Sequence, residues 1–279
     1  MNKLLLHEWL GLALLTWLFV QLALALGWWN REILIVGFLL AMNCALVLLA
    51  PYGGSDRSWR LRILFYAVAM NALYFELRTA IPAINPRLSD SVLQAADQAL
   101  VGTNLSLQLQ QITLPVLTDF FSLCYMLFFT YLFIGQVAYL IGDLAILKKF
   151  AVGQFSLYAV GYFGYALVPA RGPHVAMAGQ FGTALVGGWL TEANERLVLA
   201  GSIGVDAFPS LHCASSLYLL LSDYQHHRWR FWVFLVPCIG LWCSTLYLRY
   251  HYFADVACGL ALGWLAWILA KRVTRVHWL

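Results

Sequence analysis

Charged residues are scarce in this chain of 279 residues. Asp, Glu, Lys and Arg make up only 11% of it, whereas hydrophobic residues make up 62%. Soluble domains contain about a quarter charged residues, so the composition excludes an ordinary soluble protein. The six cysteines form no CxxC pair and mostly lie inside apolar segments. That distribution argues against a disulfide framework or a cysteine-bound metal and favours small buried side chains.

Eight apolar segments run through the chain. They lie at about 9–29, 33–50, 61–83, 118–142, 150–168, 208–222, 230–248 and 253–270. Most approach the ~20 residues that a membrane-spanning helix needs, and 208–222 is short enough to be partly re-entrant. The first segment has no small-residue cleavage site, so we expect a retained helix. The sequence thus predicts an all-α polytopic membrane bundle.

The seventeen basic residues divide unevenly between the two sides of such a bundle. Eleven fall on one side and six on the other: Lys3, Arg57, Arg60, Arg62, Lys148, Lys149, Arg228, Arg230, Lys271, Arg272 and Arg275, against Arg31, Arg78, Arg87, Arg171, Arg196 and Arg249. Cytoplasmic loops of membrane proteins carry the excess of Lys and Arg, so both termini are predicted to be cytoplasmic. The bias also explains the net charge of +4 without a nucleic-acid partner.

Ionisable residues at membrane depth are costly and by default mark a functional site. His212 lies in the stretch Phe208-Pro209-Ser210-Leu211-His212, while His251 and Asp255 lie in Tyr247–Asp255. In a helix His251 and Asp255 share a face, so the carboxylate can fix the imidazole tautomer and leave one nitrogen free to react.

Phosphate is the ligand that the neighbouring residues favour. Pro209 and Ser210 precede an apolar run, as residues at a helix start do, and a helix N-terminus attracts anions. Arg171 follows the 150–168 segment, and arginine binds phosphate through a planar fork of donors. His212, His251 and Asp255 could also ligate zinc, but Arg171 and Arg249 on the same side repel a metal, so we expect no metal and no cofactor.

These motifs resemble those of the type 2 phosphatidic acid phosphatase superfamily. Phe208-Pro209-Ser210-Leu211-His212 and His251-Tyr252-Phe253-x-Asp255 are similar to the branch that contains inositol phosphorylceramide synthases. The resemblance implies a six-helix core over roughly 61–271. We therefore expect a division into an added N-terminal transmembrane helix pair at 1–56 and a phosphatase or phosphotransferase core at 57–279.

The resemblance also implies a role for each motif residue. His251 becomes the nucleophile that forms a phosphohistidine, Asp255 orients it, and His212 serves as general acid and then as base. Arg171 and the amides near Ser210 hold the phosphoryl oxygens. The substrate is then a membrane lipid phosphate at the non-cytoplasmic leaflet, and the acceptor is water or a lipid hydroxyl.

Four positions depart from the family pattern. Gly164 stands where the family has a lysine, Leu211 where it has glycine, and Thr245 where it has an arginine; Gly172 also separates Arg171 from its proline. Arg249 lies one helical turn from Thr245, and we expect it to replace the missing arginine as a phosphate ligand.

Two long stretches, 84–117 and 169–207, are predicted on the non-cytoplasmic side. The first contains Asp90 and Asp97 in a weakly amphipathic pattern, so it is either a helix on the bilayer surface or a solvated connector. The second is rich in glycine, as a mobile loop would be. A charge pair of Glu76 and Arg78 within the third segment favours a contact between helices. Asp119 is expected to cap the helix it begins.

A transporter or flippase with an Asp–His relay is the alternative function. Sites of secondary transporters lie near the bilayer midplane, whereas the ionisable residues here fall at segment ends on one side. A purely structural membrane subunit leaves that clustering unexplained.

Overall fold

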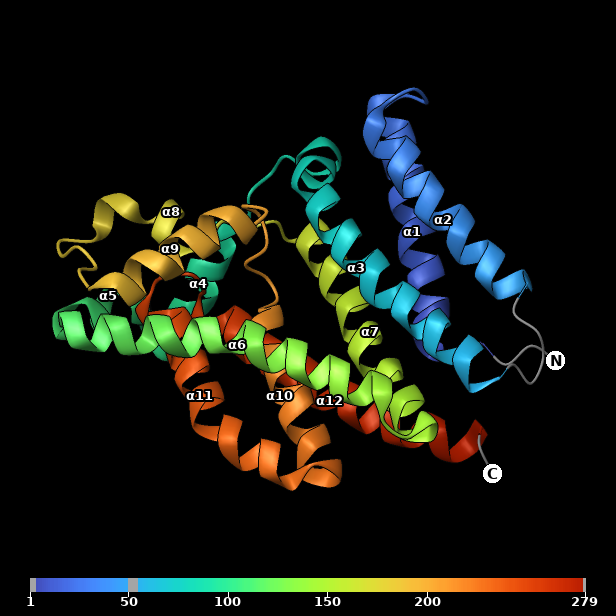
Figure 1. Cartoon of the computed structure of the whole chain (residues 1–279). Coiled ribbons are helices and arrows are strands. Elements are labelled where there is room, and N and C mark those ends of the chain that lie inside the picture. The colour runs from blue at the N-terminus through green and yellow to red at the C-terminus, as the bar shows by residue number, and fades with distance from the viewer. Residues whose placement is uncertain (1–3, 50–54, 278–279) are drawn as a thin grey trace.

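The computed structural model describes residues 4–49 and 55–277 (Figure 1). Its regular elements are all helices, which loops connect, and one isolated backbone bridge joins two of the loops. Eight long helices form the bundle: α1 (Leu6–Leu26), α2 (Arg31–Leu49), α3 (Asp56–Ile84), α6 (Pro115–Ile141), α7 (Leu144–Leu167), α10 (Leu211–His226), α11 (Arg228–Tyr247) and α12 (Phe253–His277). Lys3 and the two chain ends, on which the predicted orientation partly rests, lie outside these ranges.

The eight long helices correspond to the eight predicted segments. Within the described ranges, five of them (α1, α2, α6, α11 and α12) are long and apolar enough to cross a membrane. The prediction of an all-α integral membrane bundle with two additional N-terminal helices is therefore confirmed. α10 has only 16 residues, in agreement with the short segment from which it was predicted.

α7 lies at the centre of the bundle, where it contacts α1, α3, α10 and α12. Protein covers most of its surface, so a strongly apolar sequence is not needed there. At Gly153, Gly161 and Gly164, an added Cβ would lie 2.3–2.4 Å from Tyr218, Leu211 and Pro209 respectively. These glycines let α7 approach α10 and the turn that precedes it, because any side chain there would overlap its neighbour.

Polar contacts join α1 and α2 to α3. The Glu8 carboxylate in α1 accepts hydrogen bonds from the Arg62 guanidinium, including one of 2.7 Å from Nη2. The Tyr66 hydroxyl donates to Asn43 of α2 at 2.8 Å. All four groups therefore find partners within the bundle. The division of the chain at residues 56 and 57 stays a prediction.

Glu76 of α3 pairs with Arg31 of α2 at 3.0 Å, and Arg78 instead donates to the Ser202 carbonyl at 2.5 Å. The predicted contact between helices is confirmed, but its partners differ from the Glu76–Arg78 pair.

Short helices cover one end of the bundle (Figure 1). They are α4 (Asp90–Val101), α5 (Leu105–Leu109), η1 (Gln110–Ile112), α8 (Pro173–Ala176), η2 (Ala178–Gln180) and α9 (Trp189–Gly201). Asp119 caps α9 rather than its own helix, because its carboxylate accepts from the backbone N–H groups of Gly188 and Thr191.

α4 is a helix and not a solvated connector, and its predicted place on the bilayer surface stays a prediction. It packs against α12, buries Asp90, Leu93 and Asp97, and exposes the apolar Val92 and Leu100. The buried face is thus the acidic one, which indicates that the two carboxylates have partners inside the protein.

Replacing Gly164 by Ala is expected to lower stability, because the added methyl would overlap the rigid Pro209 ring. Overpacking a tight contact typically costs about 1–3 kcal/mol. Thermal unfolding of the detergent-solubilised protein measures the effect. Gly179→Ala is the matched control, since nothing lies within 4 Å of a Cβ at Gly179. Equal unfolding temperatures for the two variants would contradict the proposed contact.

Candidate active site

A cavity of about 370 Å³ lies at the end of the bundle that the short helices cover. Aromatic side chains make up much of its wall, and the polar groups in it include His212, His251 and Arg171. α10 begins at Leu211, α7 ends at Leu167 and α12 begins at Phe253, so three motifs far apart in the sequence reach the cavity from helix ends. The prediction that they share one end of the bundle is confirmed.

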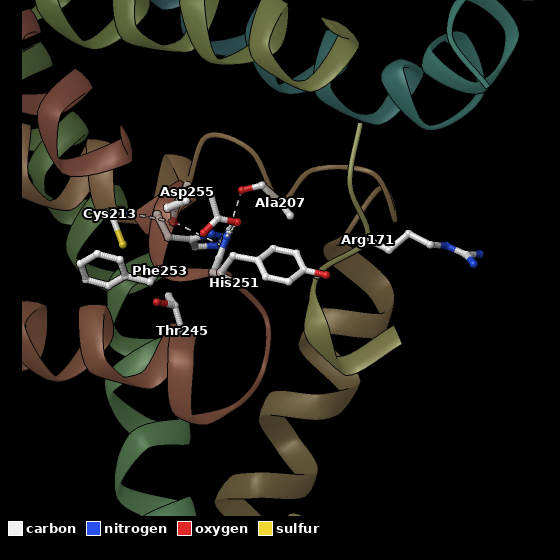
Figure 2. A network of polar contacts seen from close by, with 12 residues as sticks. Arg171, Ala207, Cys213, Thr245, His251, Phe253 and Asp255 are labelled. Carbon is white, nitrogen blue, oxygen red and sulfur yellow. Dashed lines mark hydrogen bonds and ion pairs between the residues drawn. The ribbon is translucent and has the colours of Figure 1, made fainter. Parts of the chain in front are cut away.

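His251 lies in the loop between α11 and α12, two residues before α12 begins. The expectation that His251 and Asp255 share a helical face is therefore wrong in its premise. The predicted contact nevertheless forms: Nδ1 of His251 lies 3.2 Å from Oδ2 of Asp255 and 3.0 Å from the Ala207 carbonyl oxygen (Figure 2). Both residues are buried, with 4% and 0% exposure.

The partners of His251 assign its tautomer. Both neighbours of Nδ1 are acceptors, so Nδ1 carries the proton and donates to them. Nε2 then keeps its lone pair and accepts a hydrogen bond from the Ser210 hydroxyl, whose Oγ lies 3.3 Å away. The nitrogen available for nucleophilic attack is therefore Nε2.

Burial of the ring lowers the pKa of His251, but the carboxylates of Asp255 and Asp206 and the Ala207 carbonyl together outweigh this effect. The net result is a pKa raised above the ordinary histidine value of 6.5. The Ala207 carbonyl was not predicted, because backbone acceptors leave no signal in a sequence.

Ser210 caps α10, as predicted: its hydroxyl oxygen accepts a hydrogen bond of 3.5 Å from the Cys213 backbone N–H. The Ser210 N–H itself donates to the Asp255 carbonyl at 3.1 Å. The next N–H groups, of Leu211 and His212, belong to the first turn of α10 and have no intrahelical acceptor. They can donate to an anion at Nε2 of His251.

His212 lies in the first turn of α10, and its ring centroid is 5.8 Å from that of His251. Its Nε2 lies 3.1 Å from the Tyr125 hydroxyl, a contact that sequence reasoning missed because Tyr125 is one of many aromatic residues in its segment. Among the described residues Nδ1 of His212 is buried without a hydrogen-bond partner. An incoming polar group would satisfy it.

Arg171 lines the cavity, but its guanidinium points away from His251 (Figure 2). Its side chain is exposed, so it can reorient toward a phosphate. Gly172, which separates it from Pro173, has φ +87°, and a Cβ there would lie 2.2 Å from the Tyr250 carbonyl oxygen. This departure from the family pattern therefore brings the Arg171 loop close to the His251 loop.

Arg249 does not replace the missing arginine through a shared helical face. α11 ends at Tyr247 and Arg249 has φ +67°, so the premise of a shared helical face is wrong, whereas the binding of phosphate by Arg249 stays a prediction. Its guanidinium donates to the Thr183 carbonyl at 2.6 Å and lies 3.9 Å from the centroid of the Phe181 ring, and it does not line the cavity. Arg249 thus contacts the glycine-rich stretch.

Thr245, at the position of the family arginine, contributes through its backbone. Its carbonyl accepts hydrogen bonds from the N–H groups of Tyr250 (2.9 Å) and His251 (3.0 Å). The turn that carries the nucleophile is therefore anchored to the last turns of α11.

Asp90 and Asp97 of α4 hold the loops of the site, a role that the sequence did not reveal. Asp90 accepts from the N–H groups of Arg171 (3.1 Å) and Gly172 (3.0 Å) and from the Tyr252 hydroxyl (3.0 Å). Asp97 accepts from the N–H groups at the start of α12, Phe253 at 3.1 Å and Ala254 at 2.8 Å. Burial raises the pKa of Asp97 more than these two hydrogen bonds lower it.

Two departures from the family pattern lie at tight packing contacts. A lysine at Gly164 would overlap Pro209, and Leu211 fills the space beside Gly161. Within the part of the chain that the structure describes, no three His, Cys, Asp or Glu side chains are grouped as a metal site requires.

The PAP2 superfamily, whose members include type 2 phosphatidic acid phosphatases, matches residues 91–269. The chain is also 28% identical over 208 residues to the inositol phosphorylceramide synthase of Candida albicans (strain SC5314 / ATCC MYA-2876). That alignment covers 69% of this chain and 44% of the relative, so the chain spans less than half of the relative's length. No solved structure is significantly similar.

The matched segment runs from the second residue of α4 through most of α12 and contains every motif residue named above, whereas Asp90 lies just before it. Membership implies an enzyme of the lipid phosphatase or phosphotransferase type. The chain belongs to the PAP2 superfamily, as its motifs predicted, and is distantly related to inositol phosphorylceramide synthase.

Proposed function

We propose that this protein transfers the phosphoryl group of a membrane lipid through a phosphohistidine on His251. The observation that carries the proposal is the set of hydrogen-bond partners of the two nitrogens of the His251 ring. Nδ1 is engaged by Asp255 and Ala207, and Nε2 is directed to Ser210 at the N-terminus of α10. A buried imidazole with one fixed proton and one available lone pair is what nucleophilic catalysis needs.

In the first step Ser210 releases Nε2, whose lone pair attacks phosphorus. The bond between phosphorus and the leaving oxygen breaks, and protonated His212 donates its proton to that oxygen. The ring of His251 becomes positively charged, and the carboxylate of Asp255 stabilises this charge. Arg171 and the first N–H groups of α10 bind the phosphoryl oxygens, and Arg171 reorients to do so.

In the second step neutral His212 removes a proton from the acceptor hydroxyl, whose oxygen attacks phosphorus as the bond to Nε2 breaks. Water as acceptor gives hydrolysis, and a lipid hydroxyl gives headgroup transfer. The relative is named as a synthase, which supports transfer. The site lies at helix ends, which favours an enzyme over the transporter alternative.

The positive-inside rule supports an orientation with this end of the bundle facing the periplasm, the lumen or the exterior. The substrate is then a lipid of the outer leaflet, which reaches the cavity from the membrane. Whether the membrane is a plasma, inner or endomembrane follows from the host cell.

Phosphate from a labelled lipid analogue whose leaving group needs no protonation should become trapped on His251 in the variant His212→Ala, because the phosphohistidine then forms without the general acid while its breakdown loses the general base. His251→Ala should carry no label and show no turnover. Mass spectrometry of acid-sensitive phosphopeptides locates the label. His226→Ala, at the opposite end of α10, is the control and should behave as wild type. Label on a residue other than His251 would refute the assignment.

Activity should fall as pH drops through the raised pKa of His251, because a protonated Nε2 has no lone pair for attack. The acid limb of kcat/KM is thus expected above pH 6.5. Asp255→Asn removes the carboxylate that raises this pKa. The acid limb of kcat/KM, measured on the residual activity of this variant, should therefore shift to lower pH. The same lipid is used for both proteins, which cancels the substrate's own titration. An unshifted limb would rule out His251 as its origin.

Arg171 and Arg249 should differ in what their loss affects. Arg171→Gln is expected to lower kcat/KM by about ten- to a hundredfold, the value of a hydrogen bond to a charged group, with unchanged thermal stability. Arg249→Gln should instead lower the unfolding temperature, because it removes the bond to the Thr183 carbonyl. The reverse pattern would make Arg249 the phosphate ligand, as the sequence first indicated.

A further inference from the structure

Asp206 is a carboxylate that the phosphoryl-transfer mechanism does not use. It lines the same cavity as both catalytic histidines, and among the described lining residues it is the only Asp or Glu. Its Oδ2 accepts a hydrogen bond of 2.5 Å from the Tyr74 hydroxyl of α3, and its Oδ1 accepts one of 2.9 Å from Ser202. The side chain is therefore held in place at the cavity wall.

Tyrosine rings surround this carboxylate. Tyr74 and Tyr162 have ring centroids 6.1 Å apart, and Tyr162 and Tyr165 have centroids 5.9 Å apart. Tyr125 lines the same cavity as Asp206 and these three rings. All four tyrosines line the cavity. Aromatic faces combined with a carboxylate attract organic cations, quaternary ammonium groups above all.

The carboxylate lies next to the proposed phosphate site. Asp206 forms an isolated backbone bridge with Ala170, the neighbour of Arg171, and the Ala207 N–H donates to the Ala170 carbonyl at 3.1 Å. Ala207, in turn, accepts from His251. A negative charge so near a bound phosphate repels it unless a positive charge lies between them.

Within the described lining, Arg171 and Asp206 are the only residues of types charged at neutral pH, one of each sign, beside three histidines. An anionic phosphate with a neutral headgroup would match Arg171 and leave Asp206 uncompensated. A zwitterionic headgroup matches both charges. We propose that the cavity selects lipid phosphates whose headgroup carries an ammonium group, bound by Asp206 and the surrounding tyrosine rings. This inference rests on the proposed phosphoryl transfer at His251.

The test compares headgroups in vesicles or micelles with the purified full-length protein. Phosphatidylcholine and phosphatidylethanolamine carry an ammonium group, phosphatidylinositol and phosphatidylglycerol carry neutral polyols, and phosphatidic acid carries no headgroup. We expect kcat/KM to be at least tenfold higher for the ammonium lipids than for the polyol lipids. Asp206→Asn should lower this ratio about tenfold, equivalent to about 1.4 kcal/mol.

Glu192→Gln is the matched control. It also neutralises a carboxylate, but Glu192 lies in α9, is exposed and pairs with Arg196. It should leave the ratio unchanged. Turnover that favours polyol lipids or phosphatidic acid would overturn the selectivity while the phosphoryl transfer stands. An equal loss for every lipid in Asp206→Asn would also overturn it, because the residue would then act on the reaction itself.

Binding of choline phosphate and inositol phosphate, measured by their effect on the unfolding temperature, separates the two proposals if no lipid is turned over. Stabilisation by choline phosphate that disappears in Asp206→Asn supports the ammonium site and refutes the phosphoryl transfer. No stabilisation by choline phosphate in wild type, together with no turnover, refutes both.

Discussion

The site depends on two buried carboxylates in a helix that contributes no catalytic group. Asp90 and Asp97 lie one above the other on the inner face of α4, where only 6% and 1% of each residue is exposed. The carboxylate oxygens of Asp90 accept hydrogen bonds from backbone N–H groups of the Arg171 loop, and those of Asp97 accept from N–H groups at the start of α12. Buried backbone N–H donors need hydrogen-bond acceptors, and a loop offers few acceptors within its own backbone.

Hydrogen bonds from loop to carboxylate bring together segments that are far apart in the chain. Asp90 accepts from Gly172 and from Tyr252, the residue after His251. The Arg171 loop and the His251 loop are therefore fixed to the same carboxylate. The relative position of Arg171 and His251 then follows from α4 as much as from the two helices that end there.

Close packing of α7 accounts for the unusual form of the motifs. Pro209 occupies the space that a side chain at position 164 would need, and Leu211 occupies the space beside Gly161. These are two separate contacts, since Leu211 packs beside Gly161 and Pro209 beside Gly164. With no lysine at position 164, Arg171 is the only Lys or Arg in the described cavity wall.

The sequence predicted those features that depend on local pattern. Hydrophobic length located the eight helices, and the Pro209-Ser210 pair located the start of α10. The contact of His251 with Asp255 was predicted correctly from an incorrect helical premise, because four residues of a turn leading into a helix span a similar distance. The same premise failed for Arg249, where a left-handed residue reverses the chain direction. Ala207 and Asp90 act through tertiary contacts to backbone groups, and no spacing in a sequence encodes those.

The least predictable part of the site is the wall that faces the substrate. α3 contributes Asn71, Tyr74 and Phe75 to it, yet α3 ends before residue 91, where the family match begins. α1 and α2 hold α3 through Glu8–Arg62 and Asn43–Tyr66, and these contacts are buried.

The chemistry and the choice of substrate therefore have different structural origins. The matched region supplies the histidines, the aspartate and the arginine to which we assign the reaction with phosphate. The N-terminal helices position the Tyr74 hydroxyl against Asp206 and so shape the part of the cavity to which we assign the headgroup. Change in α1–α3 can alter which lipid is bound without disturbing the hydrogen bonds of His251, because no N-terminal residue contacts that ring among the described interactions.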